Sequence, residues 1–450
     1  MMKNVISVFL FILMLAVVAC SKTDKDIAQP LNKDGTPQET VASTKTENAN
    51  TETTTTPVSN IAYTRLNMDD SKPVTGLYRF YDGKAGIIDS NGRIVCEPKY
   101  NGASFFGSEY AVMSTTLLAD DEKEYHDIFG DKIDPDSVYS VSTFVDSDGK
   151  EVFGYFADAT GFSQEGLAVV KDAKGHFHTM DKSGNIVSTL DNENIAQVEM
   201  IHEGMALFRT HDRKYGYLND KLEIVIEPEF SYGRAFSEGL AYVWQDGKNY
   251  YIDKSGSVVI ELPEEAGEPW EGDIFFQGAD RYDAWDFSDG LAYVFLPARS
   301  VTDENGNETW VEADGYYIDK NGNKVLEIIA GTKFVNGLAA AYDKETGKCG
   351  YIDKSGKFVI APQYTAAYTF NESGLAFVFE DNGARSIDDR RCGYINAFGE
   401  TVIPFEYYTP RLYPFDMMEN GIVRLWKGGT TAQYYLRSDG TILGKVESGE

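Results

Sequence analysis

The sequence predicts an all-β fold of tandem three-stranded antiparallel repeats that form an open, curved array. Three observations support this prediction. One phrase returns nine times, strand-forming residues fill it, and short polar loops with a glycine separate its parts. The cleanest copy runs from Cys349 to Ile360 and reads Cys-Gly-Tyr-Ile-Asp-Lys-Ser-Gly-Lys-Phe-Val-Ile.

Each copy contains three short segments that are rich in Val, Ile, Tyr and Phe. The first reads Gly-Leu-Ala-x-Val, the second Gly-Tyr-Ile-Asp, and the third is a β-branched run after a glycine. Segments of this kind, bounded by glycine or polar residues, are typical of β-strands. Counted from the first segment, the units begin near residues 76, 109, 166, 204, 239, 290, 337, 374 and 421.

The polar loop between the second and third segments predicts a tight hairpin, since its glycine can adopt the left-handed conformation. The repeated Asp of this loop could bind calcium, but its neighbours lack the carboxylate spacing of an EF-hand. We therefore expect the Asp to accept hydrogen bonds within its own turn. Asn219 and Asn396, which replace it in two units, can do the same.

A proline follows the third segment in four units, where it predicts the end of the strand because it cannot donate a ladder hydrogen bond. An aromatic residue comes two or three positions later and is expected to pack against the next unit. The proline and aromatic pairs are Pro98 and Tyr100, Pro228 and Phe230, Pro362 and Tyr364, and Pro404 and Tyr407.

Two architectures accommodate such repeats, an open solenoid and a closed β-propeller. Propellers typically have about four to eight blades of four strands. Nine three-stranded units, each complete in sequence, favour the open array, and the propeller is the alternative.

The N-terminus predicts export and lipid attachment. An apolar run from Val5 to Val18 follows Lys3 and is too short for a comfortable transmembrane helix, so residues 1–19 are expected to be a signal peptide. The segment Val17-Val18-Ala19-Cys20 resembles the lipobox of bacterial lipoproteins, and this resemblance implies that Cys20 carries the lipid. Ser21 resembles the pattern of proteins sent to the outer membrane.

Residues 20–62 are rich in Thr, Asn, Glu and Lys and cannot bury enough apolar surface to fold, so they predict a flexible tether. The folded β-repeat domain is expected at 63–450. Three cysteines remain after Cys20, namely Cys96, Cys349 and Cys392. Equivalent positions in successive repeats lie too far apart for a disulfide, so we expect buried free thiols.

The formal net charge of −30 argues against nucleic acid or anionic lipid as a partner. No nucleophile elbow, phosphate-binding loop or Cys-His pair occurs in the sequence. His176 and His178 share one face of a predicted strand, but they lack the spacing of a metal motif. We therefore expect no enzyme activity, metal or cofactor.

The repeated phrase, followed by Pro-x-Tyr and Phe-x-x-Gly-Leu-Ala-x-Val, resembles the WG-repeat family of bacterial proteins. The resemblance covers roughly residues 76 to 443, with Tyr or Phe mostly in place of the tryptophan of the family name. It implies an all-β repeat scaffold, often exported and usually without an assigned activity.

Four insertions interrupt the repeats, at 115–140, 262–284, 296–313 and 380–391. Loops that leave a repeat scaffold are often its binding side. Trp270 and Trp310 lie in two of them among acidic residues and are candidates for contact with a sugar ring or a protein partner. Alternatively, these aromatic side chains plug the end of a neighbouring unit.

The sequence therefore predicts a lipid-anchored protein of the bacterial cell envelope that acts as a binding or scaffolding module for protein or glycan. The alternative function is a carbohydrate hydrolase that uses carboxylates from the inserted loops.

Overall fold

The computed structural model describes residues 64–65 and 76–447, apart from 108, 118–123, 137, 265, 267–285, 303–307, 312, 381–382, 384–389, 410–417, 419 and 428–431. The chain divides into two compact units, Met1–Ser59 and Asn60–Glu450, and the second contains all described residues. The predicted signal peptide, Cys20 and the tether lie outside the described residues. No helix in the described part of the chain is long and apolar enough to cross a membrane.

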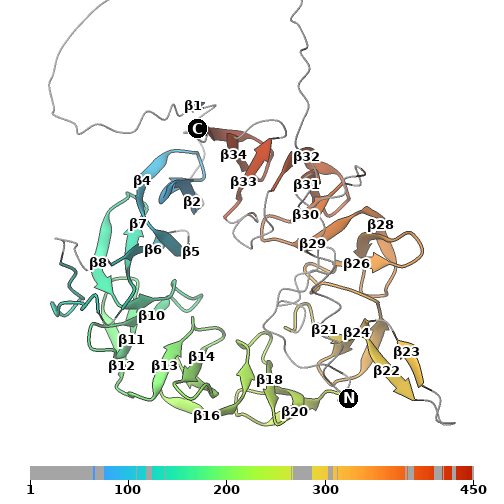
Figure 1. Cartoon of the computed structure of the whole chain (residues 1–450), viewed down its shortest axis with the longest axis horizontal. Coiled ribbons are helices and arrows are strands. Elements are labelled where there is room, and N and C mark those ends of the chain that lie inside the picture. Colours follow the sequence, from blue (N-terminus) through green and yellow to red (C-terminus); the bar gives the residue numbers. More distant parts are fainter. Residues whose placement is uncertain are drawn as a thin grey trace, which may run out of the picture. The chain divides into compact units, whose positions relative to one another are not determined.

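The regular elements of the described residues are β-strands, which form nine successive units (Figure 1). The first four units contain the following strands: β2 (Leu77–Asp82), β3 (Lys84–Asp89) and β4 (Ile94–Tyr100); β5 (Gly102–Phe106), β6 (Tyr110–Thr116), β7 (Ser140–Asp146) and β8 (Glu151–Phe156); β9 (Asp158–Ala159), β10 (Leu167–Lys171), β11 (Phe177–Asp181) and β12 (Ile186–Leu190); β13 (Ile195–Val198), β14 (Met205–Thr210), β15 (Tyr215–Asn219) and β16 (Ile224–Phe230).

The remaining five units contain these strands: β17 (Tyr232–Gly233), β18 (Ala241–Gln245), β19 (Lys248–Ile252) and β20 (Val258–Glu261); β21 (Leu291–Leu296), β24 (Asp314–Asp319) and β25 (Lys324–Glu327), with the hairpin β22 (Arg299–Thr302) and β23 (Glu308–Val311); β26 (Ala339–Asp343), β27 (Lys348–Ile352) and β28 (Phe358–Tyr364); β29 (Ala366–Phe370), β30 (Leu375–Phe379), β31 (Cys392–Asn396) and β32 (Thr401–Tyr408); β33 (Ile422–Lys427), β34 (Ala432–Arg437) and β35 (Ile442–Glu447). Nine tandem all-β units are therefore confirmed.

Five units have a fourth strand that the sequence did not predict. This strand precedes the Gly-Leu-Ala strand and pairs with it antiparallel, as β17 does with β18. The added strands are short, and β9 and β17 have only two residues each. They arise from the linker after the preceding unit, so the full pattern is a four-stranded meander.

The glycine of Gly-Leu-Ala forms the turn between these first two strands. At Glu238 and Gly239 the backbone φ angles are 52° and 87°, and Ser237 and Leu240 exchange backbone hydrogen bonds across the turn. Two consecutive positive φ angles define a type I′ turn, which suits the twist of a hairpin. Glycine is required at the second position because a Cβ atom is strained there.

In eight units an Asp or Asn of the repeated phrase organises the turn between its second and third segments, as expected, whereas the ninth unit has Arg437 at this position. Asp253 Oδ1 accepts hydrogen bonds from the backbone N–H groups of Ser255 (2.8 Å) and Ser257 (3.1 Å). Asn219 Oδ1 accepts the equivalent bonds from Lys221 and Glu223, each at 2.9 Å. These contacts confirm the structural role of the side chain in the turn.

The hydrophobic core is divided into clusters that lie between neighbouring units. In one cluster Tyr217 and Phe230 of the fourth unit pack with Phe236 and Val243 of the fifth. The aromatic residues that follow the prolines, Tyr100, Phe230, Tyr364 and Tyr407, are all buried in such clusters, as predicted. A unit of this size cannot bury an apolar face by itself, so the interfaces stabilise the array.

The prolines do not end the third strand, contrary to the prediction. Pro98, Pro228, Pro362 and Pro404 lie inside β4, β16, β28 and β32. At each of them the pairing with the preceding strand shifts a second time, beyond the shift that every unit has near its hairpin. A β-bulge accommodates a proline inside a strand, because the bulged residues leave the regular ladder.

The two ends of the array are in contact, which departs from the expected open arrangement. Tyr78 and Phe80 of the first unit pack with Tyr435 and Val446 of the ninth. The backbone N–H of Tyr81 donates to the Tyr435 hydroxyl at 3.0 Å, and β1 (Thr64–Arg65) pairs antiparallel with β35. Figure 1 shows the strands of the first and ninth units side by side.

The curved array of small antiparallel sheets is therefore confirmed, whereas its ends are joined as in the propeller alternative. The terminal units have apolar faces that would otherwise need a polar cap, and each covers the other. The three described cysteines, Cys96, Cys349 and Cys392, are buried thiols that form no disulfide with one another, as predicted.

Candidate functional site

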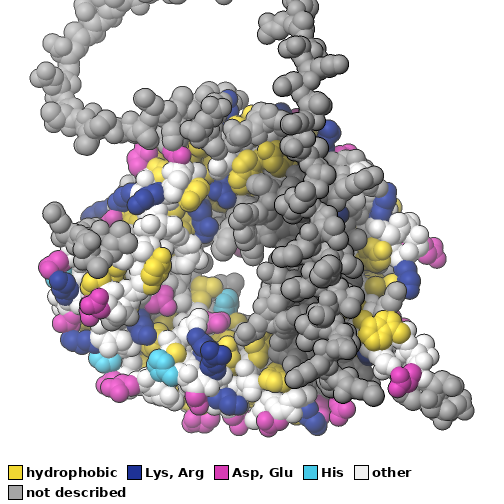
Figure 2. All heavy atoms as spheres, viewed as in Figure 1, with side chains coloured by type: hydrophobic (Ala, Val, Ile, Leu, Met, Phe, Trp, Pro, Cys, Tyr) yellow, Lys and Arg dark blue, Asp and Glu magenta, His cyan; other side chains and the backbone are white. Residues whose placement is uncertain are grey.

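The antiparallel connectivity assigns each loop to one of two rims of the array. In every four-stranded sheet, one turn joins the first strand to the second and another joins the third strand to the fourth. Both turns lie at the same end of the sheet, and we call this end the turn rim. The connection from the second strand to the third and the link to the next unit lie at the opposite end, and we call that end the insertion rim. Acidic and basic side chains are interspersed over the face that Figure 2 shows.

All four insertions leave from the insertion rim. The segments 115–140, 296–313 and 380–391 each join the second strand of a unit to its third, and 262–284 joins β20 to the next unit. The strand order therefore places the points at which all four insertions leave the scaffold at one end of the sheets.

The structure describes only one of the two candidate tryptophans, Trp310. Trp310 lies on β23, opposite Ser300 of β22, and is 68% exposed, so it does not plug a neighbouring unit. Trp270 lies outside the described residues. The hairpin β22–β23 projects from the sixth unit in Figure 1, and the Arg299 guanidinium contacts Asp314 at 2.9 Å at its base.

Two exposed aromatic residues of the insertion rim were not singled out from the sequence. Tyr139 (80% exposed) and Phe129 (53% exposed) both lie in the insertion of the second unit. Both residues lie inside a segment that the sequence had already marked as an insertion, and this position could have identified them as candidate contact residues. On the turn rim Phe398 is 85% exposed, at a position that Ser255 and Ser355 fill in two other units.

The insertion of the second unit folds back onto the third unit. Tyr125 and Ile133 form a small core with Val141. Asp127 Oδ2 accepts a hydrogen bond from the backbone N–H of Ala173 at 3.0 Å, and Lys174 contacts Asp131 at 2.5 Å. These contacts fix the base of the loop.

The predicted histidine pair converges on one carboxylate. His176 Nδ1 and His178 Nε2 each lie 3.1 Å from Asp172 Oδ2, and His178 Nδ1 lies 2.9 Å from the Thr189 hydroxyl. Burial raises the pKa of Asp172, but the hydrogen bonds from His178 and His176 outweigh burial and lower it. Within the described residues no group of three or more His, Cys, Asp or Glu side chains could hold a metal ion.

A charged cluster joins the first two units. Glu151 contacts Lys99 Nζ at 2.8 Å and accepts hydrogen bonds from the hydroxyls of Tyr100 (2.7 Å) and Tyr155 (2.5 Å). Burial alone would raise the pKa of Glu151, but these three hydrogen bonds lower it to about 2. The cluster holds Glu151 as a carboxylate.

On the turn rim a repeated contact joins consecutive units. The acidic residue of the type I′ turn accepts a hydrogen bond from the backbone N–H of the turn glycine in the next unit, as Glu238 Oε2 does from Gly290 at 2.9 Å. Lys320 of that next unit donates to the Glu238 carbonyl at 2.9 Å. The same arrangement joins Glu203 with Gly239 and Lys254, and Asp289 with Gly337 and Lys354.

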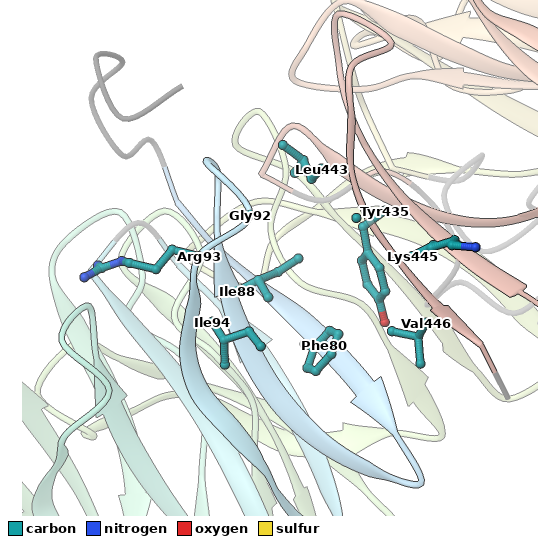
Figure 3. A pocket seen from close by; sticks show the side chains of 10 residues that line it. Phe80, Ile88, Gly92, Arg93, Ile94, Tyr435, Leu443, Lys445 and Val446 are labelled. Carbon is teal, nitrogen blue, oxygen red and sulfur yellow. The ribbon is translucent and has the colours of Figure 1, made fainter. Parts of the chain in front are cut away.

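A pocket of about 200 Å³ lies between the first and ninth units (Figure 3). Phe80, Ile88 and Ile94 line it on one side, and Tyr435 and Leu443 line it on the other. The pocket is largely apolar, and it forms where the first and ninth units contact each other.

Four segments of the chain, residues 86–114, 215–248, 350–383 and 393–416, match the family model described as "WG containing repeat". The chain carries WG repeats. Each matched segment starts at the Gly-Tyr strand of one unit and continues toward the next, so the WG repeat spans the boundary between neighbouring sheets. The four segments start in the four units whose third strand contains a proline.

The WG-repeat chain is also similar to solved structures of low sequence identity. The computationally designed Ika8 protein is 14% identical, with 64% of this chain and 86% of that chain covered and a TM-score of 0.35. BamB from Moraxella catarrhalis is 12% identical, with 74% and 98% covered and a TM-score of 0.34. A eukaryotic initiation factor is 13% identical, with 75% and 98% covered and a TM-score of 0.34. No curated protein matches the chain.

Proposed function

We propose that this WG-repeat chain is a lipid-anchored module of the bacterial cell envelope that binds a protein or glycan partner through its insertion rim. The proposal assigns the chain a binding role without catalysis, a lipid at Cys20 and a place at the outer membrane. The observation that carries it is the departure of all four insertions from one rim of the array.

The described part of the insertion rim exposes large aromatic side chains, which are typical of contact surfaces. Trp310 and Tyr139 are large, exposed and amphipathic, and such residues supply much of the binding energy in protein interfaces and stack on sugar rings. The repeated turns of the opposite rim are engaged in contacts between units, so they serve the scaffold. A net charge of −30 favours a neutral or cationic partner.

The binding role is tested by replacing residues 297–313 with the short Asp-Gly turn that joins the corresponding strands at Asp246 and Gly247. The shortened chain is expected to unfold at the same denaturant concentration as wild type. It is expected to lose capture of cross-linked partners from envelope extracts, or of ligands on a glycan array. Unchanged capture would contradict the assignment of this rim.

The anchor is tested separately with Cys20→Ala. We expect this variant to leave the membrane fraction, and wild type to sediment with outer membranes on a density gradient. Continued membrane association of Cys20→Ala would contradict lipid attachment at this residue.

A further inference from the structure

One position of the repeated phrase supplies an aliphatic side chain to the junctions between units. In five units the tyrosine of the phrase pairs across the hairpin with an Ile or Leu: Tyr217 with Ile226, Tyr251 with Ile260, Tyr317 with Leu326, Tyr351 with Ile360, and Tyr394 with Ile403. Such a side chain packs in one buried cluster with an isoleucine of the next unit, as Ile226 does with Ile252 and Ile360 with Ile395. It therefore helps to fill the junction at close-packed density.

The ninth unit has a glycine at this position. Tyr435 pairs with Gly444, so no side chain extends from the position into the junction with the first unit. Ile88 of the first unit takes the place that Ile252 and Ile395 have in other units. Both Gly444 and Ile88 line the pocket of about 200 Å³ (Figure 3). The pocket therefore lies where other junctions contain an aliphatic side chain.

The walls of this pocket suit an apolar ligand. Phe80, Ile94, Leu443 and Val446 line it, and the Tyr435 hydroxyl already accepts the backbone N–H of Tyr81 at 3.0 Å. An apolar cavity of about 150 Å³ lined by Leu, Ile and Phe stays dry and binds small apolar molecules. Pockets that enclose a whole drug-sized ligand measure about 300–1,000 Å³. The pocket therefore has room for one short alkyl chain.

The charged residues that line the pocket are both cations, Arg93 and Lys445, although the chain has 71 acidic and 41 basic residues. Figure 3 shows the two side chains on opposite sides of the pocket and directed away from its apolar centre. Arg93 Nε contacts Asp89 at 2.9 Å, and the Arg93 side chain is 51% exposed. A guanidinium has five N–H donors and pairs well with carboxylates. Positive charge therefore lies at the edge of an apolar pocket.

We propose that the pocket between the first and ninth units binds a free anionic amphiphile, such as a medium-chain fatty acid. Its alkyl chain occupies the space beside Gly444, and its head lies near Arg93 and Lys445. Because the ligand contacts both terminal units, it stabilises their closure. A net charge of −30 opposes contact with an anionic membrane surface, so a free amphiphile is favoured over a membrane lipid.

This site goes beyond the proposed function and is independent of it. The pocket lies between the first and ninth units, whereas the exposed Trp310 belongs to the sixth. Capture of a partner through the insertion rim and binding of the amphiphile are measured separately, so either proposal can fail without the other.

The experiment is isothermal titration calorimetry of the full chain with Cys20→Ala, purified without detergent, against decanoate below its micelle-forming concentration. We expect saturable binding of one decanoate per chain. Decanol lacks the anionic head and is expected to bind at least threefold more weakly. Butyrate has the head but only a short chain, and it is expected not to bind.

Gly444→Ile fills the pocket with the residue that three other units have at this position. Gly444 lies in β35 and, among the described glycines, is not one with a positive φ, so an isoleucine suits its backbone. We expect the substitution to weaken decanoate binding at least tenfold, with a denaturant midpoint no lower than that of the parent chain. Val225→Ile, at an exposed position of β16, is the control and is expected to bind decanoate as the parent chain does.

A second measurement needs no substitution in the pocket. Saturating decanoate is expected to slow hydrogen–deuterium exchange at least threefold in Leu77–Asp82 and Ala432–Arg437, on the two sides of the pocket. Exchange in Ile224–Phe230, at the junction of the fourth and fifth units, is expected to stay unchanged. This measurement decides the proposal if Gly444→Ile does not fold.

Four results would overturn the proposal: no saturable binding of decanoate, as expected if another segment of the chain fills the pocket; equal binding by Gly444→Ile in its folded state; equal binding of decanol; or no local slowing of exchange. Binding to phospholipid vesicles that is lost in Gly444→Ile would assign the site to a membrane lipid and would overturn the assignment to a free amphiphile.

Discussion

Asn420 in the ninth unit donates a hydrogen bond from its side-chain amide to the carbonyl of Leu77 in the first unit, at 2.9 Å. The same amide donates to the carbonyl of Phe106 at 2.8 Å. Asn420 occupies the turn position that Glu238 and Asp289 fill in other units, where each contacts the following unit. The junction between the two ends of the chain therefore uses the same position as the junctions inside the array.

Asn420→Gly is expected to weaken this closure. Glycine tolerates the positive φ of 47° at this position, so the substitution removes the two hydrogen bonds without straining the turn. The loss should lower the free energy of unfolding by about 1–3 kcal/mol, measured as an earlier denaturant midpoint. Asn336→Gly, at the equivalent turn of the seventh unit with a φ of 52°, is the control and should change the midpoint little. Equal effects of the two substitutions would argue against closure through Asn420.

Tyr351→Phe tests the tyrosine of the repeated phrase. The buried Tyr351 hydroxyl donates to the carbonyl of Tyr368 in the next unit at 2.9 Å. Removal of this hydroxyl leaves a buried carbonyl without that donor and should cost about 1–2 kcal/mol of unfolding free energy. Tyr317→Phe, which removes the equivalent bond to Thr332 at 2.6 Å, should have a similar effect. A neutral result for both would mean that the phrase tyrosines act through packing alone.

The Glu151 cluster predicts a pH-dependent difference between wild type and Glu151→Gln. The pKa of Glu151 in the folded chain, about 2, lies below its ordinary value of 4.5. The carboxylate therefore contributes stability above about pH 4.5, and this contribution is lost as the pH falls toward 2. At pH 7 the variant should be less stable by about 1–3 kcal/mol, and urea midpoints of the two proteins should approach each other below pH 4.5. A difference that stays constant with pH would show that the cluster is not the cause.

The thiol of Cys349 should be inert in the folded chain. Burial raises its pKa to about 11, and the residue is only 6% exposed. Because the thiolate is the reactive form, labelling with a thiol reagent at pH 8 should be at least tenfold slower than in denaturant. Labelling followed by digestion and mass spectrometry measures this for Cys349 individually. Equal rates in the folded and denatured chain would mean that the seventh unit opens readily.

The local parts of the fold could be predicted from the sequence because the interactions that form them are local. Asp253 and the residues that it bonds lie within four positions of each other, so the turn is visible in the phrase itself. The buried aromatic residues after the prolines recur at the same place in four units and were predicted for the same reason.

Features that depend on distant contacts could not be predicted. The bond between Asn420 and Leu77 joins residues 343 positions apart, and the phrase contains no information on where the array ends. The short first strands, such as Tyr232–Gly233, were missed because two residues give no alternating pattern. Pro362 was assigned to a strand end because the bulge that accommodates it depends on the pairing with β27.

The central claim is that the insertion rim binds the partner while the turn rim belongs to the scaffold. Trp310 and Phe398 test it most directly, because they are exposed to 68% and 85% and lie on opposite rims. Capture of cross-linked envelope partners by Trp310→Ala should fall at least tenfold, whereas Phe398→Ala should capture as wild type does. Loss of capture with Phe398→Ala, together with unchanged capture by Trp310→Ala, would contradict the account.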